Sequence, residues 1–119
     1  MKAKEITKRI ISHFLEKNNH EYKTSLKNTK PQNITDEYWK DLALFYESLE
    51  GDNRKLLFEI INRIQIDTIS MMLGLLDGNV ILDGQKEDFV LKFENREDVI
   101  VDLQAHFLEQ TEGVKGKSK

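Results

Sequence analysis

Residues 54–76 form an apolar segment that any fold of this chain has to enclose. Large apolar side chains are spaced there so that they cover most of the circumference of a helix: Leu56, Leu57, Phe58, Ile60, Ile61, Ile64, Ile66, Ile69, Met71, Met72, Leu73, Leu75 and Leu76. A helix that is apolar nearly all round is buried within its own domain or against a partner. The sequence therefore predicts that this helix is the central element of one domain, residues 1–112.

Two amphipathic helices are predicted before it. The spacing of Ile6, Ile10 and Phe14 indicates a helix over residues 4–18, and a second helix runs from Thr35, its N-cap, to residue 50. The short turn that follows predicts an antiparallel hairpin of the second and third helices, with the N-terminal helix packed on it. Residues 18–33 are polar and aperiodic, and they are expected to form a mobile loop.

The apolar period changes after residue 78. Residues 80–82 and 89–93 indicate two short antiparallel strands, and residues 99–101 fit either a third strand or the first turn of a last helix that Asp102 caps. The expected fold is α+β and mostly helical, with a helical hairpin, an N-terminal helix, a two- or three-stranded antiparallel sheet and a C-terminal helix. Residues 113–119 are expected to be a disordered basic tail.

Charge is segregated along the chain. Residues 1–30 carry eight Lys or Arg against three Glu, a net charge of +5, and residues 31–112 carry seven against eighteen Asp or Glu, a net charge of −11. Lys115, Lys117 and Lys119 make the end of the chain basic again. Such a charge asymmetry influences which partners the protein binds and how fast it meets them, but it does not determine the fold.

Signatures of catalysis and of cofactor binding are missing from the sequence. It has no cysteine, no glycine-rich phosphate loop and no nucleophile elbow. Asp77 and Asn79 match the first ligand positions of an EF-hand calcium-binding loop. Ile81 and Leu82, however, occupy the positions where that loop needs an oxygen ligand and a glycine. The three histidines share no metal-binding spacing. We therefore expect no enzyme, no catalytic or metal-binding residues and no cofactor.

One polar stripe interrupts the apolar third helix and provides the candidate ligand or partner site: Asp67, Ser70, Gly74 and Asp77. A carboxylate among these apolar residues has to be paired, hydrogen-bonded or at an opening to solvent, and Arg63 lies one turn before Asp67 as the obvious partner. The two small residues, four apart, would let another backbone approach closely. The alternative is a purely structural polar stripe that faces water or the neighbouring hairpin.

The stretch Asp67-Thr68-Ile69-Ser70-Met71-Met72-Leu73-Gly74-Leu75-Leu76-Asp77-Gly78, followed by a strand with Phe89 and an acidic last helix, resembles small uncharacterised bacterial proteins. Some small acidic proteins of this general kind are immunity proteins against toxins. The resemblance implies no site residues.

Three functions remain open. The leading hypothesis is a non-enzymatic interaction protein whose acidic surface captures a basic protein, with an immunity- or antitoxin-like inhibitor as one form. The second is a small-ligand or catalytic site around Asp67, Ser70 and Asp77, and the third is a homodimer that covers the surplus apolar surface. The acidic body argues against nucleic acid as a partner. No apolar run reaches the roughly 20 residues of a membrane span, and the cytoplasm is the expected compartment.

Overall fold

The protein is built from helices alone over the part of the chain that the structure describes. The computed structural model describes the backbone of residues 1–117 and the side chains of residues 1–112. Helix accounts for 70% of the chain, and no strand forms among the described residues. The predicted α+β fold with a small antiparallel sheet is therefore wrong, because the sheet does not form.

The basic N-terminal region is one long helical rod. α1 (Ala3–Ile10), a π-helical segment (Ile11–Glu16) and α2 (Lys17–Asn28) follow one another without a break. A π-helical turn inserts one extra residue into a helix. That insertion offsets the rotation of the apolar stripe along so long a helix, so the buried side chains of Thr7, Leu15 and Leu26 can share one side of the rod.

The structure therefore differs from the mobile loop expected at residues 18–33. Most of this range is α2, and Pro31–Asn33 form a short 3-10 turn. The Nδ2 of Asn19 donates to Oδ1 of Asn62 at 2.6 Å, and Nε2 of Gln65 donates to Oδ1 of Asn19 at 2.5 Å. These hydrogen bonds attach α2 to α4 through polar side chains, which an apolar periodicity cannot reveal.

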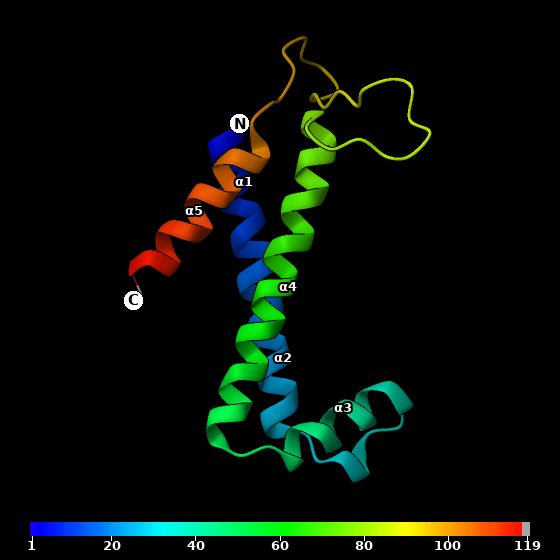
Figure 1. The fold of residues 1–119 in the computed structure, drawn as a ribbon, viewed down its shortest axis with the longest axis vertical. Helices are drawn as coiled ribbons and strands as arrows, with labels where there is room; N and C mark the ends of the chain where they lie inside the picture. The colour runs from blue at the N-terminus through cyan, green and yellow to red at the C-terminus, as the bar shows by residue number, and fades with distance from the viewer. Residues whose placement is uncertain (118–119) are drawn as a thin grey trace.

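α4 (Gly51–Asp77) runs antiparallel beside the rod, and α5 (Leu103–Lys117) packs against both α1 and α4 (Figure 1). α3 (Glu37–Ser48) lies at the other end, where it contacts α2 and points away from α4. The predicted antiparallel hairpin of the second and third helices is thus not formed. α3 instead packs on the end of the rod, where the rings of Tyr22 and Trp39 are 5.5 Å apart.

The core lies where α1, α4 and α5 meet. Phe107 is completely buried, and Leu103 and Leu73 are 1% and 5% exposed. Partly buried apolar side chains surround them: Ala3, Ile6, Ile10, Ile11, Ile66, Ile69, Leu91, Ile100 and Leu108. This core is small for a chain of 119 residues, because only one half of α4 contributes to it.

The molecule is consequently extended and exposes much surface. Its accessible surface is 9138 Å², whereas a compact monomer of the same mass exposes about 6,700 Å². Its radius of gyration is 17.9 Å, against about 13.5 Å for a compact domain of this length. The surplus of about 2,400 Å² is larger than the roughly 800 Å² that one partner buries in a standard protein–protein interface.

Residues 78–102, which we call the connecting segment, join α4 to α5 without regular structure. The backbone N–H of Ile100 donates to the carbonyl of Leu91 at 2.7 Å, and these two residues form an isolated bridge where strands were predicted. An isolated hairpin is marginal in water unless a third strand or a helix covers it, and most of these side chains face solvent.

The two ends of α5 also differ from the prediction. Residues 99–101 precede the helix as neither strand nor helix, since α5 begins at Leu103. Its backbone continues to Lys117 across most of the tail that was expected to be disordered. The last two residues of that tail lie outside the described residues.

Candidate functional site

Asp77, the last residue of α4, caps the first turn of α5. Its carboxylate accepts hydrogen bonds from the backbone N–H of Leu103 at 3.1 Å and of Gln104 at 2.8 Å. The first N–H groups of a helix have no acceptor within the helix, so a carboxylate there satisfies them and opposes the helix dipole. Asp102 was expected to supply this cap, but its φ of 64° is left-handed and the acceptor is Asp77 instead.

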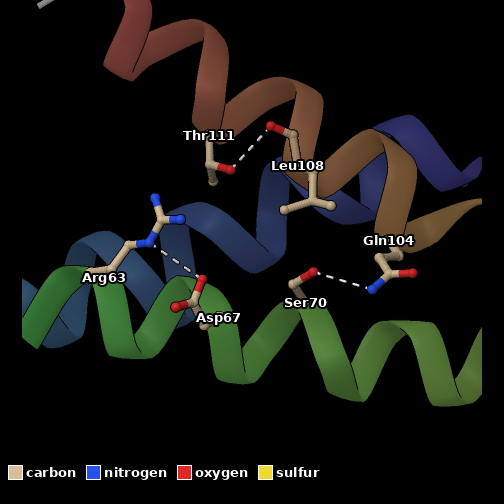
Figure 2. A network of polar contacts seen from close by, with 6 residues as sticks. All are labelled: Arg63, Asp67, Ser70, Gln104, Leu108 and Thr111. Carbon is tan, nitrogen blue, oxygen red and sulfur yellow. Dashed lines mark hydrogen bonds and ion pairs between the residues drawn. The ribbon is translucent and has the colours of Figure 1, made fainter. Parts of the chain in front are cut away.

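Ser70 and Gly74 lie in the contact between α4 and α5. Gln104 donates from Nε2 to Oγ of Ser70 at 3.3 Å, as Figure 2 shows. A Cβ added to Gly74 would lie 2.8 Å from Cγ2 of Val80 and 2.9 Å from Cδ of Gln104. The small residues therefore allow close approach of neighbouring segments, and Val80 and Gln104 fill the space beside Gly74.

Asp67 lies apart from the other three residues of the stripe. It forms an ion pair with Arg63, Nε to Oδ1 at 3.4 Å (Figure 2), which confirms the expected partner. Both side chains are more than half exposed, at 57% for Asp67 and 58% for Arg63. An exposed pair one helical turn apart contributes only a few tenths of a kcal/mol. At Asp67 the structure therefore corresponds to the alternative of a polar stripe that faces water.

The structure thus divides the predicted site between two environments. Ser70, Gly74 and Asp77 connect α4 to α5 and to the start of the connecting segment, whereas Asp67 faces solvent. The carboxylate oxygens of Asp77 are occupied by backbone N–H groups, which leaves them poorly placed for a ligand. Within residues 1–112, no group of three or more His, Asp or Glu side chains could hold a metal ion.

The connecting segment carries a surface that sequence reasoning missed. Its exposed large apolar side chains range from 41% exposed for Phe93 to 69% for Val90: Ile81, Leu82, Phe89, Val90, Phe93, Val99 and Val101. Seven acids and three basic residues are interspersed among them, a net charge of −4. The apolar pattern was the available signal, and it predicted half-buried strands. The local sequence cannot show that no other segment of the chain packs over these side chains.

α4 bears a second apolar surface, which we call the α4 stripe. It consists of Leu56, Ile60, Ile64 and Met71, which are 47–62% exposed. Their spacings of 4, 4 and 7 place them along one face of the helix, away from the buried Ser70 and Leu73. The prediction that α4 is enclosed all round therefore does not hold within a single copy of the chain.

Comparison of this chain with protein-family models, with curated proteins and with solved structures finds no match. Within the described residues, no helix combines the length and the hydropathy that crossing a bilayer requires.

Proposed function

We propose that this protein is a non-enzymatic interaction protein that captures a basic protein partner on its connecting segment. The observation that carries the proposal is the exposure of large apolar side chains among acids along residues 78–102. Large exposed apolar patches rimmed by polar residues mark interaction sites. A structureless segment of this length within a folded domain is usually either functional or a linker, and its exposed apolar side chains favour a function.

The two components of this surface have different roles in binding. Apolar side chains such as Phe89 and Phe93 provide affinity when a partner removes them from water. The acids steer a basic partner toward the segment and exclude acidic competitors. The proposal therefore requires association that slows as salt is raised, together with a bound state that depends on the aromatic anchors.

An immunity-like inhibitor of a basic toxin is one form of this function. The cytoplasm remains the proposed compartment, because a chain without cysteine needs no oxidising environment to fold. The small-ligand alternative at Asp67, Ser70 and Asp77 finds little support in the geometry, since Asp67 is isolated and the space beside Gly74 is filled.

The test is a pull-down from a lysate of the source organism with three forms of the protein. Wild type and the control Phe14→Ser should retain the same basic protein at low salt, and the double variant Phe89→Ser/Phe93→Ser should lose it. Phe14 is 55% exposed on the N-terminal rod, so its replacement removes a comparable side chain from another surface. A partner that survives both the double substitution and a high-salt wash would contradict the proposal.

Homodimerisation through the α4 stripe is a second candidate function. The stripe is apolar apart from Asp67, which lies on the same face between Ile64 and Met71 and pairs with Arg63 one turn earlier. Two copies of α4 packed antiparallel would place Arg63 of each copy near Asp67 of the other, so the surface is complementary to itself. Light scattering across a range of protein concentrations tests this candidate, and a monomer throughout would reject it.

A further inference from the structure

A groove of about 670 Å³ opens at the end of the molecule opposite the connecting segment. It lies between α2, the last turn of α3 and the first turns of α4, where these helices meet in Figure 1. We call it the basic groove, and its lining includes Lys23, Lys27, Arg54, Lys55, Phe58 and Glu59. Its volume is typical of a small-molecule site.

The groove gathers basic residues from two regions of opposite net charge, the basic N-terminal rod and the acidic remainder of the chain. Lys23, Lys27, Arg54 and Lys55 face a single acid, Glu59, so the lining carries a net charge of +3. The ion pairs found among the described residues, Arg9–Glu5 and Arg63–Asp67, lie elsewhere. A concentration of positive charge in a concave surface attracts anions more strongly than the same charges spread over a convex one.

The basic side chains are gathered around two aromatic rings. Nζ of Lys23 lies 5.8 Å and Nζ of Lys27 lies 5.9 Å from the centroid of the Phe58 ring. The guanidinium of Arg54 lies 4.6 Å from the centroid of the Tyr46 ring. Such cation–π contacts hold the charges in place and leave N–H donors available for a ligand.

Arg54 is positioned further by the end of α3. Its Nε donates to the carbonyl of Tyr46 and its Nη2 to the carbonyl of Glu47, both at 3.2 Å. Two of the five N–H groups of the guanidinium are used in this way. The side chain is therefore fixed at the edge of the groove before any ligand arrives, which lowers the entropy lost on binding.

We propose that the basic groove binds a small ligand that carries two or more phosphates. Four basic side chains around one cavity exceed what a single carboxylate or phosphate can neutralise, and an oligophosphate matches a net charge of +3. Lysine and arginine donate charge-assisted hydrogen bonds to phosphate oxygens, and Phe58 offers an apolar surface beside them. The acidic remainder of the chain would repel a long nucleic acid but has little influence on a ligand enclosed in the groove.

The experiment measures binding of inorganic triphosphate and of ATP by isothermal titration calorimetry at physiological salt. We expect saturable binding of both probes, with orthophosphate much weaker. The double variant Lys23→Gln/Lys27→Gln should raise the Kd by about a hundredfold, because each of the two lost charged hydrogen bonds weakens binding by roughly tenfold. The ratio of the ATP and triphosphate affinities then reports whether a nucleoside adds contacts.

The control Lys4→Gln/Lys8→Gln removes two exposed lysines with the same spacing from the same rod, outside the groove. It should change the Kd less than twofold, since a specific site depends on its own side chains. The proposal is overturned if wild type binds neither probe or if both double variants weaken binding equally. It is also overturned if orthophosphate binds as tightly as triphosphate. Circular dichroism verifies that each variant retains its helix content.

Discussion

Asp77 accepts a hydrogen bond from the backbone N–H of Gln104 at 2.8 Å, across 27 residues of sequence. Through this contact the end of the longest helix fixes the start of the last helix. Gln104 makes a second contact with α4, because its side chain donates a hydrogen bond to Ser70, two turns before Asp77. Asp77 and Ser70, two of the four predicted site residues, thus hold the two helices together.

Asp77→Ala is expected to lower the free energy of unfolding by about 1–2 kcal/mol, because two N–H groups at the start of α5 lose their acceptor. Asp77→Asn should recover part of this loss. Urea unfolding followed by circular dichroism measures both. Asp67→Ala is the matched control, and its exposed ion pair predicts a change of at most about 0.5 kcal/mol. Equal losses for the Asp77 and Asp67 variants would contradict the capping role.

Gly74→Ala should destabilise the protein although alanine favours helix. The new methyl group would lie 2.8 Å from Val80 and 2.9 Å from Gln104, and such overpacking usually lowers stability by about 1–3 kcal/mol. The gain in helix propensity offsets about 1 kcal/mol of it. Gly51→Ala provides the comparison, because nothing lies within 4 Å of its added methyl group. Thermal unfolding should show a lower Tm for Gly74→Ala only.

Phe107→Ala should remove a large part of the stability. Phe107 is fully buried where α1, α4 and α5 meet, and truncation of a buried phenylalanine lowers the free energy of unfolding by about 3–5 kcal/mol. The control Phe14→Ala removes a ring that is 55% exposed. Chemical denaturation should place the Phe107 variant far below wild type, with the control close to it. A small effect at Phe107 would mean that the core lies elsewhere.

Ile60→Glu/Ile64→Glu tests the α4 stripe as a homodimer contact. The two side chains are 47% and 59% exposed, so the substitutions should leave the monomer fold intact. If the stripe forms the dimer, opposed carboxylates at its centre should shift the chain to a monomer in size-exclusion chromatography with light scattering. The control Lys40→Glu/Glu47→Lys exchanges two exposed charges on α3 at constant net charge and should leave the mass unchanged.

The sequence by itself determined the features that depend only on residues close together in the chain. Residues 54–76 predicted a helix, and the observed α4 extends from Gly51 to Asp77. Its end follows from Gly78, whose φ of 84° glycine adopts without strain. The Arg63–Asp67 pair also follows from spacing, because residues four apart meet on a helix surface. Each of these features depends on residues within a few turns of one another.

Tertiary structure decided what depends on distant partners. The apolar residues at 80–82 and 89–93 could become strands only with a sheet to join, and most of their side chains remain exposed instead. The polar sequence of α2 becomes ordered through hydrogen bonds to Asn62 and Gln65 on α4. The contact of Asp77 with the start of α5 likewise joins residues far apart in the chain. The basic groove does so as well, since its lining comes from α2, α3 and α4. A sequence pattern records which face a segment would bury, whereas only the packed chain decides whether another segment is there to cover it.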